Sequence, residues 1–531
     1  MVDRSSSRRD ELIFMDDPPP YPTLSAASSE PVAGGLARQT VDLLVCLCIG
    51  VLVFRTFAAE AYVVPTGSMA PTLLGHHREV SCANCKIRFV VGIDEQGGSG
   101  PSLCPNCGQV PVGRDASIHC SGDRVLVQKF LYDFRSPRRW EVAVFHFPGE
   151  PSQAYVKRVV GLPGESIRIR DGDIYADGKI ARKSLDDIRA MRIPVHDSRF
   201  VPADSYRFPR WDFQRSLDGR KLVSGWIQGP NGNFIHQTPA DDPIQVEDWL
   251  IYHHWEPTRQ RYAPIYDFYA YNGGELHSDH PVIDVSIEAR IAATPEVEMI
   301  AVALCSGRDR FQIRIPVDPT RRIRLERNDR PVDITPRNAG RNLIRDASSP
   351  ALLEASVVDR RVQVAIDGEL LFDPYDFEEA TFETASGAID RAVREREHEV
   401  AGSIPVATRD RPPVVASTSP VALGVRGGKL SVPEFKVHRD VYYTSSLAQT
   451  PRHAFGVIKP YPLGADEYFV LGDNSPVSND SRFWQASPVV RRSMFLGKPF
   501  MVHLPGQVVP LEVFGRSVYW VPDPSKIRYI R

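Results

Sequence analysis

The sequence predicts a mainly β protein with one apolar helix near its N-terminus. Three observations lead to this fold class. Hydrophobic and polar residues alternate along many short segments, such as Val285–Ile291, which is the pattern of half-buried strands. Asp-Gly pairs such as Asp367–Gly368 separate some of these segments, and such pairs favour tight hairpin turns. One longer stretch is continuously apolar, at Leu43–Phe54.

Length and composition limit the classes of protein that fit. The chain has 531 residues, enough for about three or four domains. Hydrophobic residues make up 42% and charged residues 24%, which are ordinary values for a globular protein. The 64 basic and 66 acidic residues give a net charge of -2, which argues against a nucleic-acid partner bound through bulk charge and leaves a local basic patch open. Eight cysteines in a chain of this length exclude a small disulfide scaffold.

The N-terminal region predicts a tail and a membrane anchor. Residues 1–39 are rich in Ser, Pro, Asp and Arg, which predicts a disordered cytoplasmic tail. Residues 40–59 predict a transmembrane helix, because about 19 mostly apolar residues can span a bilayer. A cleaved signal peptide is disfavoured, since the run begins far from the N-terminus, whereas a buried core helix remains an alternative. More arginines precede the run than follow it, which places the N-terminus inside and the body outside.

Two segments after this helix contain residues suited to nucleophilic catalysis. Two prolines bracket a turn with Thr66, Gly67 and Ser68. Such a turn can present a hydroxyl and backbone N–H groups together, but a serine nucleophile also needs a base. The chain has no Gly-x-Ser-x-Gly elbow at this turn and no Ser-x-x-Lys, which excludes two common arrangements. Lys157 is a candidate base because it lies within the apolar stretch Val156–Val160, where desolvation lowers the pKa of an amine.

Four segments, taken in order, resemble bacterial type I signal peptidases (leader peptidases). The family pattern is Pro-Ser-x-Ser-Met-x-Pro-Thr-Leu, then Gly-Asp-x-Val-x-Val-x-Lys, then Lys-Arg-Val-x-Gly-x-Pro-Gly, then Gly-Asp-Asn-x-x-x-Ser-x-Asp-Ser-Arg. The matching segments are Pro65–Leu73, Gly122–Lys129, Lys157–Gly164 and Gly472–Arg482. They depart from the pattern at Thr66, where serine is commoner, and between Asn474 and Ser478. The resemblance covers less than half of the chain.

The resemblance implies an all-β serine endopeptidase domain with a serine–lysine dyad. Ser68 would be the nucleophile and Lys157 the general base, and the Ser68 N–H and Thr66 hydroxyl would form the oxyanion hole. Ser478 would hydrogen-bond the lysine and orient it. The remaining implied positions brace the site, the last two as a pair: Asp473, Asn474, Asp480 and Arg482.

The same resemblance implies where the protein acts and on what. Its substrates would be exported preproteins, cut after a small-x-small motif to remove their signal peptides. The protein would be a single-pass protein of the bacterial inner membrane, with its catalytic body on the extracytoplasmic side. The lipid bilayer and the export translocon are the other implied partners. Catalysis would need no cofactor.

Four cysteines predict a structural zinc site. Cys82 and Cys85 form one Cys-x-x-Cys pair, and Cys104 and Cys107 form a second 18 residues later. This is zinc-ribbon spacing, and a closed Cys₄ cage leaves no position open for catalysis. In an oxidising compartment the four residues could instead form two disulfides. The flanking residues His76, His77, His119 and Cys120 are alternative ligands, but the favoured interpretation of the histidines is that they are surface or turn residues.

A long insertion separates the lysine segment from the last segment, because 320 residues lie between Lys157 and Ser478. Regular strand patterns predict a β-sandwich over 245–438. Its segments Val362–Phe372 and Gly424–Val437 resemble laminin-G or concanavalin-like sandwiches. An aromatic-rich stretch within it suits sugar stacking, although burial in the core is the favoured interpretation: Trp249, Trp255, Tyr266, Tyr269 and Tyr271.

These predictions give an order of domains along the chain. It runs as follows: cytoplasmic tail 1–39, transmembrane helix 40–59, catalytic segment 60–76, zinc-ribbon-like insertion 77–117, catalytic segment 118–181, unassigned insertion 182–244, β-sandwich 245–438 and catalytic segment 439–531. The size of the insertion also supports an alternative function. In that alternative, the chain is a catalytically degenerate, envelope-anchored protein whose β-sandwich binds a glycan or a protein.

Overall fold

The computed structural model describes most of the chain from residue 36 onward. The described ranges are 36–57, 59–93, 103–109, 118–217, 220–238, 246–256, 261–273, 280–337, 342–378, 416–444, 454–457, 459–485, 487–503, 506–507, 511–513, 516–518, 521–522 and 524–530. The chain divides into an N-terminal unit that ends at Thr56 and a β-rich unit from Phe57 onward. Most of the predicted tail, residues 1–35, lies outside the described residues.

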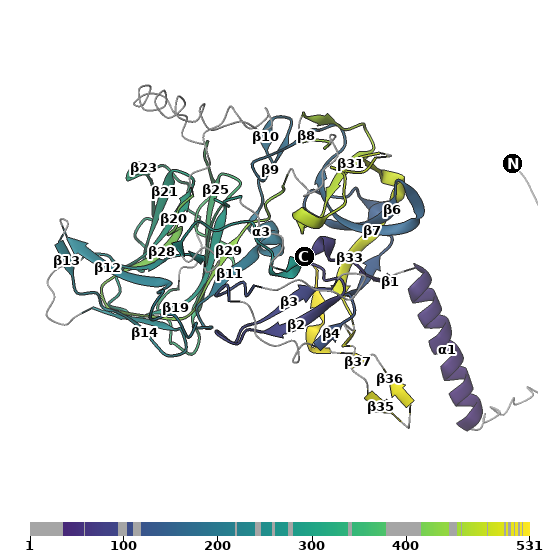
Figure 1. The fold of residues 1–531 in the computed structure, drawn as a ribbon, viewed down its shortest axis with the longest axis horizontal. Coiled ribbons are helices and arrows are strands. Elements are labelled where there is room, and N and C mark those ends of the chain that lie inside the picture. Colours follow the sequence, from purple (N-terminus) through teal and green to yellow (C-terminus); the bar gives the residue numbers. More distant parts are fainter. Residues whose placement is uncertain are drawn as a thin grey trace, which may run out of the picture. The chain divides into compact units, whose positions relative to one another are not determined.

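The N-terminal unit contains helix α1 (Leu36–Phe57), labelled in Figure 1. The predicted apolar helix is therefore confirmed as a helix, but it begins at Leu36 rather than residue 40 and ends at Phe57. It therefore includes the last residues assigned to the tail. Large apolar side chains on it are exposed, among them Leu43 and Leu47. None of the helices in the described part of the chain is both long and apolar enough to cross a membrane.

The central sheet of the β-rich unit joins strands from distant parts of the sequence. Its order is β1-β5-β33-β6-β7-β31-β32, and β38 pairs with β33. Their bounds are β1 (Ala59–Val63), β5 (Arg124–Gln128), β6 (Val142–Phe147), β7 (Glu150–Gly161), β31 (Glu467–Leu471), β32 (Val490–Arg491), β33 (Phe495–Val502) and β38 (Arg528–Tyr529). Along β5, Val125 and Val127 point into the buried core. Antiparallel pairing of β7 with β31 brings the lysine segment beside the last segment.

A smaller antiparallel sheet contains two Asp-Gly turns. Its order is β10-β9-β8-β30, with bounds β8 (Ser166–Arg170), β9 (Asp173–Ala176), β10 (Lys179–Ile180) and β30 (Tyr461–Pro462). Both residues of Asp171–Gly172 and of Asp177–Gly178 have positive φ. That backbone is the one that two-residue hairpin loops of type I′ require.

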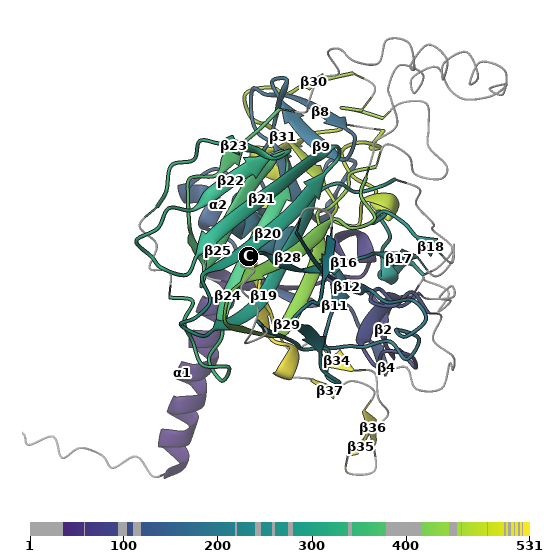
Figure 2. The ribbon, with the colours of Figure 1, turned by 90° about the vertical axis from the view of Figure 1, so that its left-hand side faces the viewer.

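The predicted β-sandwich consists of two antiparallel sheets (Figures 1 and 2). One sheet contains β11 (Ile193–Asp197), β14 (Trp226–Gln228), β15 (Phe234–Gln237), β19 (Val285–Ala293), β24 (Ala351–Val358), β25 (Arg361–Ile366), β26 (Glu369–Leu370), β27 (Tyr375–Asp376) and β29 (Lys429–Arg439). The other contains β12 (Trp211–Leu217), β13 (Arg220–Leu222), β16 (Asp248–Tyr252), β20 (Met299–Ser306), β21 (Asp309–Pro316), β22 (Arg324–Arg327), β23 (Arg330–Val332) and β28 (Val421–Arg426). Side chains from both sheets, such as Phe234 and Val302, form one buried core.

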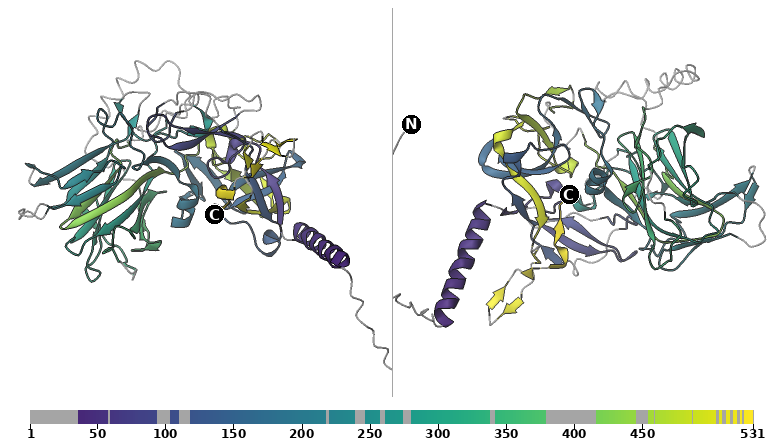
Figure 3. Two further views of the ribbon diagram at one scale, coloured as in Figure 1. Left: turned by 90° about the horizontal axis from the view of Figure 1, so that it is seen from below. Right: turned by 180° about the vertical axis from the view of Figure 1, so that it is seen from behind.

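The sandwich begins earlier in the sequence than predicted. Strands β11 to β15 come from the unassigned insertion 182–244. Of these, β11 and β15 pair with β29, and β12 pairs with β16 of the predicted sandwich. The sequence pattern of this segment is weak because several of its strands are short, as in the three-residue strand Arg220–Leu222. Further views of the two sheets are given in Figure 3. The turn Asp367–Gly368 between β25 and β26 is confirmed, with both φ angles positive.

A five-stranded sheet supports the cysteine-containing segment. Its order is β3-β2-β4-β34-β37, with bounds β2 (His77–Ser81), β3 (Arg88–Gly92), β4 (Ile118–Cys120), β34 (Gly506–Gln507) and β37 (Val521–Pro522). The remaining elements are two strand pairs and two short helices: β17 (Trp255–Glu256), β18 (Arg261–Tyr262), β35 (Leu511–Val513), β36 (Arg516–Val518), α2 (Leu131–Phe134) and α3 (Leu185–Met191).

Candidate functional site

Ser68 lies in a short 3₁₀ turn, η1 (Gly67–Met69), that follows strand β1. The serine is half-buried, whereas Thr66 before it is exposed. Asp123 belongs to the second matching segment, Gly122–Lys129. It forms hydrogen bonds with this loop on both sides of the serine. The carbonyl of Asp123 accepts from Val64 N at 2.9 Å, and its carboxylate accepts from Leu74 N at 2.9 Å. The Gly-Asp pair that precedes β5 therefore fixes the position of the serine turn.

Lys157 meets Ser68 directly. The lysine Nζ donates a hydrogen bond to Ser68 Oγ at 2.6 Å, and Lys157 is 4% exposed. Burial in β7 lowers the pKa of the amine to about 8, although the carboxylates of Asp480 and Asp473 oppose this shift. A lysine with such a pKa is neutral in a large fraction of molecules near pH 8. A neutral amine at this distance can accept the proton of the hydroxyl and leave a serine nucleophile.

The last segment holds the serine turn from the other side. Asn474 donates from its backbone N to Ser68 O at 3.1 Å and from its side-chain Nδ2 to Gly67 O at 2.9 Å. Gly472 allows this approach, because a Cβ at that position would lie 2.4 Å from Ser68 O. Asn474 alone therefore binds both the carbonyl of Gly67 and the carbonyl of Ser68.

Ser478 does not make the hydrogen bond predicted for it. Its side chain is fully buried, but Ser478 Oγ has no hydrogen-bond partner among the described residues. The lysine amine bonds Ser68 instead. Ser478 packs over Gly472, where an added Cβ would lie 2.2 Å from its Oγ. Close packing against the backbone, and not a bond to Lys157, therefore fixes this side chain in the structure.

The predicted pairing of Asp480 with Arg482 is confirmed. Two hydrogen bonds of 2.8 Å join the guanidinium to the carboxylate, and both side chains are fully buried. Asp480 also accepts from Gly472 N at 3.0 Å, and Arg482 donates to Thr444 O at 2.6 Å. The pair therefore anchors the start of the last segment to the neighbouring chain.

A second buried ion pair was not predicted. Arg158 donates to Asp473 through two hydrogen bonds of 2.7 and 2.6 Å, and both side chains are fully buried. Successive side chains of a strand point to opposite faces, so Arg158 occupies the opposite side of β7 from Lys157. An arginine within an apolar strand was the sequence signal for such a pair, because a buried guanidinium requires an acidic partner.

Three residues of the sandwich insertion also reach the site. Tyr269 donates from its hydroxyl to Asp473 O at 2.7 Å, and Tyr271 donates to His76 O at 3.1 Å. Asn272 exchanges hydrogen bonds with Asn474. Nothing in the local sequence marks these contacts, since they join residues about 200 positions apart in the chain.

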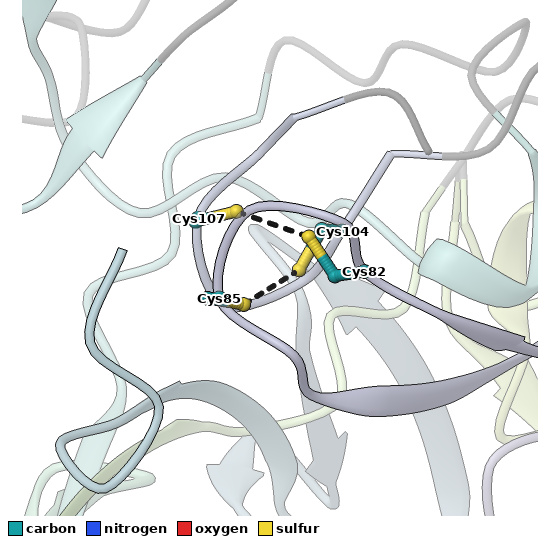
Figure 4. A group of neighbouring side chains, drawn as sticks. All are labelled: Cys82, Cys85, Cys104 and Cys107. Atoms are coloured by element: carbon teal, nitrogen blue, oxygen red, sulfur yellow. Dashed lines mark hydrogen bonds between the residues drawn. The ribbon is translucent and has the colours of Figure 1, made fainter. Parts of the chain in front are cut away.

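The four predicted zinc ligands meet in one buried group, with their thiols directed toward one another (Figure 4). The Sγ atoms of Cys82 and Cys107 are 3.5 Å apart, and those of Cys85 and Cys104 are 3.6 Å apart. These distances exceed the length of a disulfide bond, and all four residues are free cysteines. Thiolates at tetrahedral positions about 2.3 Å from a zinc ion would be about 3.8 Å apart. The group can therefore bind a structural metal.

The two cysteine turns have the same backbone geometry. Lys86 N donates to Cys82 O at 2.9 Å, and Gly108 N donates to Cys104 O at 2.7 Å. Both donors have positive φ. Between the two turns, residues 94–102 lie outside the described residues. The interpretation of His77 as a surface or turn residue was wrong, because strand β2 directs it inward and it is 4% exposed.

Comparisons with known proteins place this chain in a family. The family model of signal peptidases, peptidase S26, matches residues 114–235 and 422–504, which include Lys157 and the last segment and begin after Ser68. A signal peptidase I of Leptolyngbya laminosa is 31% identical over 203 residues, which is 36% of this chain and 74% of the relative. A probable signal peptidase I-1 of Synechocystis sp. is 26% identical over 224 residues, which is 37% of this chain and 89% of the relative.

Among solved structures, the carbohydrate recognition domain of Emp46p aligns with 45% of this chain and 93% of its own, at 10% identity and a TM-score of 0.23. A TM-score at that level supports no conclusion about the insertion. The relative from Leptolyngbya and the family model, in contrast, show the family of the chain. This chain belongs to the signal peptidase family, peptidase S26, and is a peptide hydrolase of that type.

Proposed function

We propose that the chain is a membrane-bound serine endopeptidase that removes signal peptides from exported preproteins, with Ser68 as nucleophile and Lys157 as general base. The observation that carries this proposal is the 2.6 Å hydrogen bond between Lys157 Nζ and Ser68 Oγ. The lysine is buried and its pKa is lowered to about 8. A neutral lysine amine within hydrogen-bond reach of a serine hydroxyl is the minimum that this chemistry requires.

In the proposed mechanism, Lys157 takes the hydroxyl proton while Ser68 Oγ attacks the scissile carbonyl carbon. The carbonyl oxygen becomes an oxyanion, which the N–H of Ser68 and the hydroxyl of Thr66 stabilise. Thr66 is exposed and its side chain makes no capping hydrogen bond to the turn, which leaves it suited to this role. The leaving amine receives the proton from Lys157, and the signal peptide remains as an acyl ester on Ser68. Lys157 then activates a water that hydrolyses the ester.

Ser478 acts, in this proposal, on the protonated lysine. When Lys157 carries the serine proton, its ammonium has three hydrogens to donate. Ser478 Oγ is a buried acceptor with no partner among the described residues, and it lies beside the backbone of the serine turn. Accepting from the ammonium would hold Lys157 for return of the proton to the leaving amine.

In this proposal the N-terminal apolar segment, predicted at residues 40–59, anchors the protein in the bacterial inner membrane, with the tail in the cytoplasm and the catalytic body on the extracytoplasmic side. Supporting this are the exposed apolar side chains of α1, such as Leu44 and Ile49, and the basic residues that precede it in the sequence. The bilayer and the export translocon are then its partners, since the translocon delivers preproteins to that face. Release of the full-length protein by alkaline carbonate washing of membranes would contradict this anchoring.

The test of the proposed function is cleavage of a preprotein with an Ala-x-Ala site by the purified full chain in detergent. Cleavage after the motif is expected, and its rate should rise about tenfold per pH unit below about pH 8 and level off above it, because only neutral Lys157 accepts the proton. Absence of cleavage by folded protein would contradict the function. Cleavage at a rate independent of pH between about 6 and 9 would contradict Lys157 as the base.

The four cysteines bind structural zinc in this proposal. Metal analysis of the purified full chain is expected to give about one zinc per molecule. Cys104→Ser should lose the metal and lower the unfolding temperature, because a closed Cys₄ site contributes folding energy. Cys305→Ser is the control, since that residue lies on strand β20, outside the cysteine group. Two disulfides among the four residues in metal-free, active protein would refute the site.

A further inference from the structure

The sandwich insertion places a 3₁₀ turn, η2 (Ala270–Asn272), directly on the serine turn. The ring of Tyr271 lies against Gly67, the residue before the proposed nucleophile. A Cβ on Gly67 would lie 2.0 Å from Tyr271 Cε1, so no other residue fits at position 67 while the ring is there. The Tyr271 hydroxyl donates to His76 O at 3.1 Å, which fixes the ring over the loop.

Asn272 forms a reciprocal pair with Asn474. Asn272 Nδ2 donates to Asn474 Oδ1 at 2.8 Å, and Asn474 Nδ2 donates back to Asn272 Oδ1 at 2.6 Å. The second hydrogen of Asn474 Nδ2 goes to Gly67 O at 2.9 Å. If the Asn474 amide turned over, an oxygen would face the Gly67 carbonyl and the bond would be lost. The Gly67 carbonyl selects this orientation of Asn474, and the pair with Asn272 occupies the remaining donor and the acceptor of the same amide.

These contacts are separate from the core that holds the sandwich together. Tyr269 packs with Trp140, Val160 and Phe469, which belong to the peptidase sheets and their loops. Tyr271 and Asn272 are absent from the buried apolar core between the two sandwich sheets. The sandwich thus buries its own core without this turn, and the turn's polar contacts are directed at the loop after Ser68 and at the last segment.

We propose that the insertion positions the nucleophile, with Asn272 as a positioning residue that acts on Ser68 through Asn474; this rests on the proposed function of Ser68. Asn474 binds the carbonyls of Gly67 and Ser68, and these carbonyls set where Ser68 Oγ lies relative to Lys157. A shift of about 1 Å in a reacting group can lower a rate by about 100-fold. Loss of the amide pair therefore has its effect on catalysis rather than on substrate binding.

The experiment compares Asn272→Leu, which has a similar volume but no polar atoms, with Asn272→Asp, which keeps an acceptor for Asn474 Nδ2. Asn342→Leu is the matched control, because Asn342 is an exposed residue of the same insertion. With the full chain and a preprotein substrate, Asn272→Leu should lower kcat about 10- to 100-fold and leave KM within about threefold. Asn272→Asp should recover part of kcat, and the control should match wild type.

A second measurement does not depend on activity. Amide hydrogen exchange of the peptide that contains Ser68 should be faster in Asn272→Leu than in wild type, while exchange in β19 and β29 stays the same. Unchanged exchange at the serine turn, or unchanged kcat in a protein whose wild type cleaves, would overturn the proposal. If wild type does not cleave but the exchange difference is present, the proposed function fails and the positioning contact stands. If Asn272→Leu does not fold, Asn272→Ala carries the same expectations.

Discussion

Replacement of Ser68 or of Lys157 by alanine is expected to lower kcat for preprotein cleavage by about 10⁴-fold or more. A nucleophile and its base act as a unit, so either loss removes nearly the whole chemical step. For the same reason, the double variant should be about as slow as either single variant. The measurement is the rate of preprotein cleavage per mole of folded enzyme, with folding checked by circular dichroism.

Two further variants separate the base from a general effect of charge. Lys157→Arg keeps a cation in the pocket but cannot supply a neutral amine, because arginine stays protonated; it should be as inactive as Lys157→Ala. Lys129→Ala is the matched control, since Lys129 is partly exposed and pairs with Glu60 at 3.3 Å, and it should retain wild-type activity. Cleavage by Lys157→Arg at more than a tenth of the wild-type rate would rule out a neutral lysine as the base.

The candidate dyad could be predicted from the sequence because each of its residues lies within a short contiguous segment that matches the family pattern. The serine turn, the lysine strand and the last segment each keep fixed local spacing. Strand pairing of β7 with β31 then brings two of them together. The pairing of Asp480 with Arg482 was predictable for the same reason, since the two residues are two positions apart.

The contacts of the insertion with the site could not be predicted, because they depend on how distant segments pack. Tyr269 and Tyr271 were interpreted as core residues, and both are buried. Their burial, however, is against the peptidase segments and not within the sandwich. Composition and alternation report that a side chain is buried but do not identify its partner. Likewise, the family resemblance implied a hydrogen bond between Ser478 and Lys157, whereas in the structure Ser478 packs closely at Gly472.

The second large expected effect concerns stability. Arg158→Met should lower the free energy of unfolding by about 3–5 kcal/mol, because it leaves the carboxylate of Asp473 buried without its cation. Arg158 also donates to Trp140 O at 2.5 Å, so its loss removes a link between β7 and the loop before β6. The double variant Arg158→Met/Asp473→Leu should be less destabilised than the two single losses added together, since no buried charge is then unpaired.

The control for this prediction is an ion pair in the sandwich that is open to water. Arg337 and Asp373 lie 2.6 Å apart, but their side chains are 51% and 52% exposed. Arg337→Met should therefore change stability by no more than about 1 kcal/mol. Urea unfolding of the full chain, followed through tryptophan emission, compares the variants. Equal stability losses in Arg158→Met and Arg337→Met would show that the buried pair does not hold the peptidase sheet together. Because Asp473 leads into Asn474, loss of Arg158 should also disturb the serine turn, and cleavage activity should fall before global unfolding begins.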